Sequence, residues 1–156
     1  MKRALLCVVT GNYLPMAVAM ASSYSAHHPK DDIRILLVDV SHATASKIFI
    51  DTLPNLRIEG IDVIRTVAHE KMRSYYDASE MVGAMRSPFI KKILFQDGYD
   101  QIVMLDADIY CYAPLTPFFD ALDHASIALT PHVNSPIPND GYLPDDAELQ
   151  VAGFVN

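Results

Sequence analysis

Four short, mainly apolar runs constrain the fold of this chain more than any other feature of its sequence. They are ALLCVV at 4–9, IRILLVD at 33–39, QIVMLD at 101–106 and SIALT at 126–130. Strands that are buried on both faces carry continuous rather than alternating apolar residues, and such strands occur in parallel sheets covered by helices. Because segments with helical patterns separate these runs, the sequence predicts an α/β protein with a Rossmann-like, mostly parallel sheet flanked by helices.

The first two intervening segments have helical character. Residues 13–28 combine small and apolar side chains at helical spacing, with Asn12 as the expected N-cap and Pro15 in the first turn. A second helix is predicted over 42–53, with Ser41 as its N-cap. These helices would cross over the sheet and allow neighbouring strands to run parallel.

The next part of the chain is predicted to be extended over 56–67 and helical between 70 and 97. We expect two helices there, divided at the RSPF sequence, where Ser87 would cap the second helix and Pro88 would occupy its first position. Gly98 is expected to end that helix before the strand that leads to two aspartates.

The length of 156 residues, 51% of them hydrophobic, is sufficient for one hydrophobic core. We therefore expect a single domain over 1–156. Residues 131–146 contain four prolines and no periodicity, which predicts a surface loop. The apolar stretch at 151–156 resembles the start of another buried element, so we expect the domain to be incomplete at its C-terminus and residues 147–156 to favour self-association.

Composition excludes several classes of function. The net charge is −7, and no run of Lys and Arg could follow a phosphate backbone, so nucleic acid is not an expected partner. No window approaches the about 18 unbroken apolar residues of a membrane-spanning helix. Cys7 and Cys111 lie in apolar segments, where reduced cysteine packs as a small hydrophobic residue. We expect a cytoplasmic protein, either free or peripheral to the inner face of a membrane.

Asp106 and Asp108 follow the third apolar run and flank Ala107. Ligands of open parallel sheets bind beyond the carboxyl ends of the strands. If the backbone stays extended, both side chains point to the same side and offer hard oxygen ligands to Mg²⁺ or Mn²⁺, whose other positions would be filled by water and by the phosphates of a diphosphate. The alternative is that Asp106 ends the strand and Asp108 is a solvated turn residue, because D-x-D triplets also arise by chance.

Residues 97–122, DGYDQIVMLDADIYCYAPLTPFFDAL, resemble the retaining nucleotide-sugar glycosyltransferases of the GT-A fold, in particular the family 8 group and related bacterial enzymes. In that family a strand ends in Leu-Asp-x-Asp-Ile and precedes a Pro-Leu pair and a short helix. The sequences at 126–141 and 153–156 extend the resemblance, and 10–24 is similar to the family's first loop and helix. The resemblance implies a metal-dependent transfer of sugar, with retention, from a nucleotide-diphosphate-sugar donor to an acceptor.

The resemblance also implies roles for single residues. Asp106 and Asp108 would hold the Mn²⁺ or Mg²⁺ ion that bridges the donor diphosphate. The expected donor is a UDP-sugar, and the acceptor is a glycan, a lipid or a protein. The residues implied to bind the nucleotide are Thr10, Asn12, Tyr13 and Asp39, and those implied to contact the donor sugar are Arg86, Asp106 and Asn156.

Other interpretations stay open for several of these residues. Thr10 and Tyr13 would also suit loop packing, and Arg86 would suit a solvated cation at a helix end, because the family's basic residue lies directly before the proline, where this chain has Ser87. Met104 replaces a more usual aromatic residue. His132 is a candidate metal ligand, although a histidine after a loop proline is more often a surface residue.

Two functions of other classes remain open at the level of sequence. Family members continue beyond the equivalent of Asn156 with a second half that supplies the acceptor site, so this chain is also interpreted as a non-catalytic nucleotide-binding or interaction module. A magnesium-dependent phosphohydrolase or nucleotidyltransferase is the other alternative. Against these, the TGNYLP loop lacks an aspartate nucleophile and the chain has no P-loop motif. No residue is assigned as general base or nucleophile.

Overall fold

The computed structural model describes residues 1–64 and 69–130. Several sequence-based predictions therefore fall outside the described residues. They concern the loop at 131–146, the apolar stretch at 147–156, His132 and Asn156. Within the described part of the chain, no helix is both long enough and apolar enough to cross a membrane.

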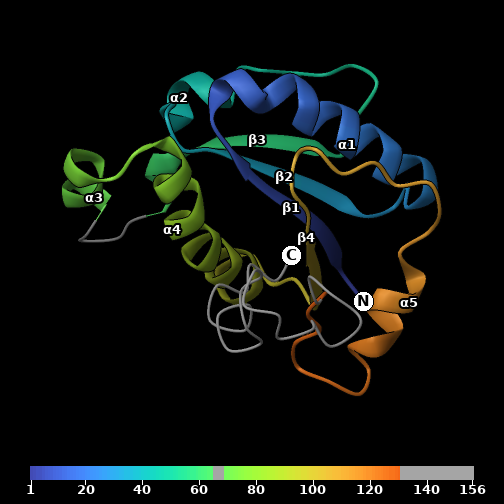
Figure 1. The fold of residues 1–156 in the computed structure, drawn as a ribbon. Coiled ribbons are helices and arrows are strands. Elements are labelled where there is room, and N and C mark those ends of the chain that lie inside the picture. Colours follow the sequence, from blue (N-terminus) through green and yellow to red (C-terminus); the bar gives the residue numbers. More distant parts are fainter. Residues whose placement is uncertain (65–68, 131–156) are drawn as a thin grey trace, which may run out of the picture.

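A four-stranded sheet, with all strands parallel, forms the centre of the described structure (Figure 1). Its order is β3-β2-β1-β4. The strands are β1 (Arg3–Val9), β2 (Asp32–Leu37), β3 (Leu56–Gly60) and β4 (Gln101–Met104). In the central register, Leu5 of β1 lies opposite Ile33 of β2 and Val103 of β4. The predicted α/β class, with a parallel sheet flanked by helices, is confirmed.

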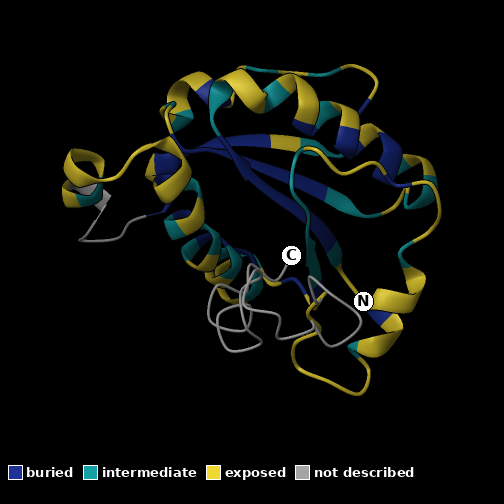
Figure 2. Cartoon of the chain, viewed as in Figure 1, coloured by how far each residue is buried: buried dark blue, intermediate teal, exposed yellow. Residues whose placement is uncertain are grey.

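Helices cover both faces of the sheet. The two long ones are α1 (Leu14–His27) on one face and α4 (Ala78–Lys91) on the other, and α4 continues into a π-helical turn, η3 (Lys92–Gln96) (Figure 1). The shorter helical elements are η1 (Gly11–Tyr13), α2 (His42–Ala45), η2 (Ile61–Val63), α3 (His69–Tyr75) and α5 (Thr116–Ala121). Figure 2 shows the buried sheet between these helices.

The core has two layers because successive side chains of a strand point to opposite faces. Leu5, Cys7 and Val9 of β1 belong to the cluster on the α1 face, which also contains Tyr24 and Phe119. The intervening residues Ala4, Leu6 and Val8 belong to the cluster on the α4 face, with Met85 and Phe89. Each fully buried Leu, Ile or Phe contributes about 1.5–3 kcal/mol, so this double burial explains the continuous apolar runs.

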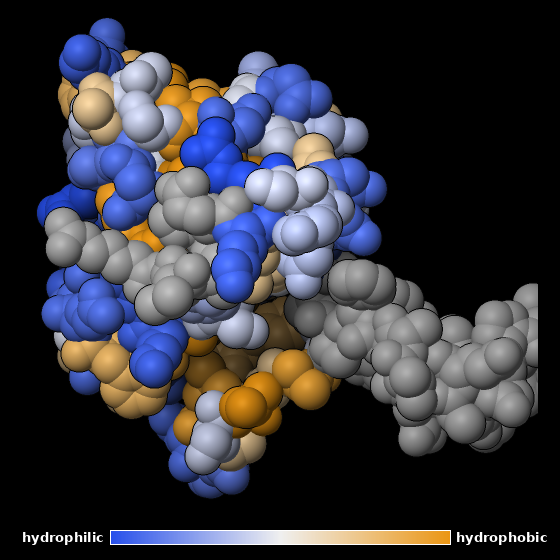
Figure 3. Space-filling view, turned by 90° about the vertical axis from the view of Figure 1, so that its left-hand side faces the viewer, coloured by the Kyte–Doolittle hydropathy of each residue, from blue (hydrophilic) through white to orange (hydrophobic). Residues whose placement is uncertain are grey.

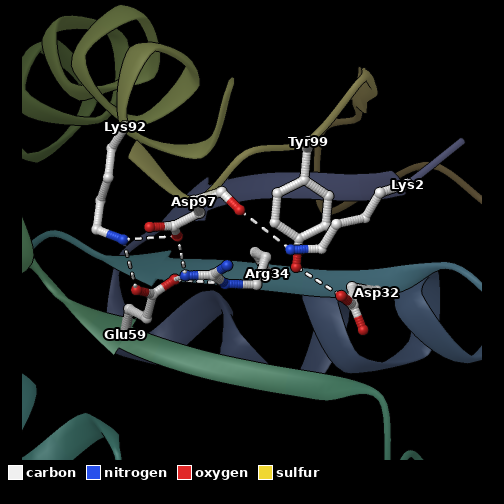
Figure 4. Close-up of polar contacts among 7 residues, drawn as sticks. All are labelled: Lys2, Asp32, Arg34, Glu59, Lys92, Asp97 and Tyr99. Atoms are coloured by element: carbon white, nitrogen blue, oxygen red, sulfur yellow. Dashed lines mark hydrogen bonds and ion pairs between the residues drawn. The ribbon is translucent and has the colours of Figure 1, made fainter. Parts of the chain in front are cut away.

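A network of charged residues lies within the α4 layer (Figure 4). Arg34 of β2 forms ion pairs with Glu59 of β3, at 2.6 Å, and with Asp97, at 2.9 Å. Lys92 of η3 lies 2.8 Å from the Asp97 carboxylate and 3.6 Å from that of Glu59. Burial disfavours ionisation of Asp97, but hydrogen bonds from Lys92 and Arg34 hold its pKa below the usual range. The network therefore attaches η3, and with it the end of α4, to the sheet.

The first helix starts differently from the prediction. Asn12 lies inside the 3₁₀ turn η1, and α1 follows from Leu14 with Tyr13 in the N-cap position and no side-chain capping bond. The turn closes through the hydrogen bond from the Tyr13 amide to the Thr10 carbonyl at 3.0 Å. Asn12 instead accepts a hydrogen bond from the Thr10 hydroxyl. The prediction that Asn12 caps this helix is wrong because the helical turn begins before it.

The helix predicted at 42–53 ends at Ala45. Ser41 occupies the N-cap position, as predicted, but makes no side-chain capping bond. Beyond the helix, Ile48 and Ile50 pack against the core while Phe49 is exposed. The chain turns after Ala45, with the Ile48 amide donating to the Ala45 carbonyl at 3.0 Å, so the prediction of a helix as far as residue 53 is wrong.

The division between the helices at 70–97 lies at Tyr76 and Asp77, not at RSPF. Asp77 forms a capping box with Glu80: its side chain accepts from the Glu80 amide at 2.8 Å, and its own amide donates to the Glu80 side chain at 2.9 Å. Pro88 lies inside α4. Two hydrogen bonds at Asp77 thus outweigh the Ser-Pro signal.

Two strand predictions also need correction. Residues 126–130 form no strand, and Ile127 and Leu129 are exposed. The segment predicted to be extended over 56–67 is a strand only to Gly60, where η2 begins, and its residues 65–67 lie outside the described chain. Gly60 packs against the start of α2, because a Cβ there would lie 2.2 Å from the amide nitrogen of His42. Gly98 ends the preceding helical turn with a φ of 69°, as predicted.

Candidate functional site

Three loops meet at the carboxyl edge of the sheet. Thr10–Tyr13 follows β1, Asp39 follows β2, and Leu105–Asp108 follows β4. Because all strands are parallel, these loops leave the sheet at the same edge, where open α/β sheets bind their ligands. Every predicted site residue within the described chain belongs to one of these loops, except Arg86, which comes from α4.

A pocket of about 350 Å³ lies at this edge, within the range of sites for small ligands. Its lining comes from the end of β1, the first loop, one side of α4 and the segment after β4. The polar side chains that line it are Thr10, Tyr13, Ser79, Arg86, Asp106 and Asp108. Figure 3 views the side of the molecule on which α2 and α3 lie, where apolar surface (orange), part of it in a hollow, interrupts the polar surface.

Helix α4 forms one wall of the pocket. Ser79, Val82 and Arg86 line it at spacings of three and four residues, which places them on one side of the helix. Met81, Met85 and Phe89 are buried in the core. This buried side determines which residues of α4 face the pocket, and the capping box at Asp77 fixes where the helix begins.

Arg86 pairs with the first of the two aspartates. Its Nη2 atom donates to Oδ1 of Asp106, and both side chains are partly buried, with exposed fractions of 24% and 30%. Arg86 lies in the interior of α4. The interpretation of Arg86 as a solvated cation at a helix end is therefore wrong, because helix α4 continues through Pro88.

The segment after β4 does not stay extended. The Ile109 amide donates to the Asp106 carbonyl at 3.2 Å, so the chain turns at Ala107 and Asp108. The expected alternation of side chains therefore fails, yet both carboxylates line the same pocket. A turn of this kind still allows two oxygen ligands to approach one cation, with Ala107 adding little bulk between them.

Asp39 accepts hydrogen bonds from the backbone of the first loop. Its two carboxylate oxygens accept from the Gly11 amide at 2.8 and 3.1 Å. Thr10 is joined to Asn12 by its hydroxyl, and Tyr13 is half exposed at the pocket. The structure thus brings Thr10 and Tyr13 to the pocket, whereas Asp39 contacts the loop backbone.

The buried thiol of Cys7, next to this site, is unreactive near neutral pH. Burial, assisted by the nearby Asp106 carboxylate, raises the pKa of Cys7 to about 12. Burial also raises the pKa of Cys111. Both cysteines are free and buried, so near neutral pH they are protonated thiols that pack in the core and do not act as nucleophiles.

Ser79 and Val82 line the pocket but were not predicted from the sequence. The available signal was the spacing of three and four residues between Ser79, Val82 and Arg86, which places them on one side of a helix that contains all three. In the part of the chain that the structure describes, no group of three or more His, Cys, Asp and Glu could hold a metal ion. The two aspartates would therefore supply only part of a coordination sphere.

Comparison with known proteins adds no assignment: no protein-family model and no curated protein matches this chain.

Proposed function

We propose that this chain is the nucleotide-binding part of a GT-A glycosyltransferase that resembles the family 8 enzymes. It would transfer a sugar, with retention, from a nucleotide-diphosphate-sugar, with UDP-sugar as the expected donor, to a glycan, lipid or protein acceptor in the cytoplasm. The observation that carries the proposal is the meeting of Arg86, Asp106 and Asp108 in one pocket at the carboxyl edge of a parallel sheet.

The two carboxylates are suitable ligands for the proposed metal ion. Magnesium binds in nucleotide sites through one or two carboxylates, several waters and the phosphates of the ligand. Asp106 and Asp108 offer carboxylate oxygens of this kind on one side of the pocket. When bound, the Mn²⁺ or Mg²⁺ ion would neutralise the diphosphate and act as a Lewis acid toward the leaving group.

The other pocket residues have complementary tasks in this proposal. Tyr13, half exposed at the rim, offers a ring face to the base, and Thr10 offers a hydroxyl to the ribose. Arg86 offers a guanidinium to the phosphate or the donor sugar. Asp39 holds the first loop through the Gly11 amide and so positions Thr10 and Tyr13.

A second candidate is a nucleotide-binding module without catalysis. Among the described lining residues, the only carboxylates are those assigned to the metal ion, which leaves none for proton transfer. The Cys7 thiol, with its pKa of about 12, supplies no nucleophile. The described pocket therefore accounts for binding more fully than for turnover.

A donor assay separates the two candidates. The purified chain is incubated with Mn²⁺ and UDP-sugars labelled in the sugar, and bound donor, released free sugar and sugar transferred to added acceptors are scored separately. A glycosyltransferase releases or transfers sugar in a reaction that requires Asp106. Retained donor without release or transfer would support the binding module, and absence of any donor binding would contradict both.

A further inference from the structure

Arg86 controls the charge of the pocket. Among the lining residues that the structure describes, Asp106 and Asp108 carry two negative charges, and Arg86 carries the single positive charge. The pocket thus has a formal charge of −1, which a divalent cation reverses to +1. The site with its cation then attracts an anionic ligand such as a diphosphate.

The Arg86 guanidinium is hydrogen-bonded to a carboxylate oxygen of Asp106 that the metal ion would use. Arg86 donates to Oδ1 of Asp106, and within the described residues this carboxylate is its only hydrogen-bonding or ion-pairing partner. A guanidinium has five N–H donors, so most of its capacity is left for a second anion. Its side chain is 24% exposed, so it is not enclosed by the core.

We propose that Arg86 makes metal binding at Asp106 and Asp108 conditional on a diphosphate. Without the diphosphate, the guanidinium neutralises Asp106 and repels a divalent cation. When metal ion and nucleotide bind together, the guanidinium moves to the phosphate oxygens and Asp106 is released to the metal ion. This inference rests on the proposed function and adds to it an order of binding, in which Arg86 acts as a positioning residue.

A supporting role for Arg86 would have the opposite effect. If the guanidinium held Oδ1 in order to present Oδ2 to the metal ion, loss of Arg86 would weaken metal binding, by about 10–100-fold for a partner of this type. We expect the guanidinium and the metal ion to compete for Asp106, because like charges at such short distance repel strongly in a partly buried site. The two roles therefore predict opposite changes in Mn²⁺ affinity when Arg86 is replaced.

The test is a titration with Mn²⁺ alone, followed by the electron paramagnetic resonance signal of free Mn²⁺. Arg86→Gln keeps a hydrogen-bond donor near Asp106 but removes the charge, and Arg86→Lys keeps the charge. We expect Arg86→Gln to bind Mn²⁺ at least about tenfold more tightly than the wild type. Arg86→Lys should stay near the wild type. Lys91→Gln, which removes a charge from an exposed position of the same helix, is the matched control and should change nothing.

The same titrations with UDP complete the test. In the wild type, UDP should raise the affinity for Mn²⁺ strongly, and in Arg86→Gln this gain should shrink. The inference is overturned if Arg86→Gln, with a circular dichroism melt that matches the wild type, binds Mn²⁺ no more tightly than the wild type does. The proposed function survives that result as long as the wild type binds Mn²⁺ and UDP together. Failure of the wild type to bind Mn²⁺ even with UDP overturns the proposed function as well. If Arg86→Gln does not fold, Arg86→Met serves as the neutral variant.

Discussion

Asp106 and Asp108 differ in their surroundings although they belong to the same turn. Asp106 is partly buried and paired with Arg86, whereas Asp108 is exposed at the pocket. Two carboxylates in one pocket repel each other unless a cation lies between them. Asp108, which has no ion-pair partner among the described residues, therefore has no evident structural task and is the better residue for separating metal binding from folding.

Replacement of Asp108 by Asn should lower the Mn²⁺-dependent affinity for UDP by about tenfold or more, because an amide keeps the shape of the side chain but removes the charge that binds the metal ion. The melting temperature of the ligand-free protein should stay the same or rise slightly. Calorimetry and thermal melts measure the two effects. Asp120→Asn, an exposed carboxylate on α5, is the control. A collapsed melt with intact binding would make Asp108 structural.

The sequence predicted that the two carboxylates lie at one site, and both line the pocket; their role as metal ligands stays a prediction. The sequence was not sufficient to pair Arg86 with Asp106. That contact depends on how α4 packs against the sheet through Met81, Met85 and Phe89, which brings two elements distant in sequence together. The Ser-Pro signal placed the boundary ten residues too late, at Ser87 instead of Asp77. The same error placed Arg86 at a helix end instead of in the interior of α4.

At the scale of the elements, α4 depends on its N-terminal capping box. Asp77→Ala should lower the free energy of unfolding by about 1 kcal/mol, because the Glu80 amide loses its acceptor and the start of the pocket wall frays. Urea unfolding measures the change. Ser41→Ala is a matched control, because Ser41 occupies the N-cap of α2 without a side-chain capping bond. Equal losses in both variants would show that the capping box contributes nothing specific.

The segment after the aspartates is fastened to α1 at two points. The Cys111 amide donates to the Ser23 hydroxyl at 2.9 Å, and the Leu115 amide donates to Nε2 of His28 at 2.8 Å. His28 stacks on Tyr24 with ring centroids 4.6 Å apart. As an acceptor at Nε2, His28 must be neutral, with its proton on Nδ1.

The His28 contact predicts a loss of stability in acid. Burial lowers the pKa of His28, with smaller contributions from Arg3 and His27, and the nearby Asp31 carboxylate opposes the shift. The unfolded chain therefore binds a proton first as the pH falls below the ordinary value of about 6.5. The stabilisation is complete above that value and is lost as the pH falls through the lower folded-state pKa. Urea unfolding between pH 5 and 8 should show this slope, and it should flatten in His28→Gln. An unchanged slope in the variant would assign it to other groups.

At the scale of the whole molecule, the charged network joins elements that are distant in sequence. Arg34 and Glu59, on neighbouring strands, are 4% and 6% exposed, and Asp97 and Lys92 come from the segment between α4 and β4. Tyr99 adds a hydrogen bond to Asp32, and Lys2 lies over its ring at 3.7 Å (Figure 4). None of these residues lines the pocket described above, so we assign the network to stability.

Arg34→Met should destabilise the protein by about 3–5 kcal/mol, because it leaves the Glu59 carboxylate buried without its arginine. The double variant Arg34→Met with Glu59→Leu should recover a large part of this loss, since it removes both charges. Denaturant unfolding of the single and double variants gives the comparison. A double variant as unstable as Arg34→Met would mean that the packing of the arginine, not its charge, matters.

The architecture was predictable because continuous apolar runs require burial on both faces, as Leu5 and Leu6 show. The wrong predictions concerned single elements and not the fold class. SIALT at 126–130 has the composition of a strand, but composition does not specify a partner, and its Ile127 and Leu129 are exposed. Likewise, the helical pattern over 42–53 does not specify where the helix ends, and the chain turns after Ala45.

The central claim is that the pocket binds a nucleoside diphosphate through a metal ion. Titration calorimetry of the chain with UDP, in Mn²⁺ and then in excess chelator, tests it most directly. We predict binding with Mn²⁺ and at least about a hundredfold weaker binding in chelator, because two carboxylates against one guanidinium repel a diphosphate. Equal affinity in the two conditions would contradict the account.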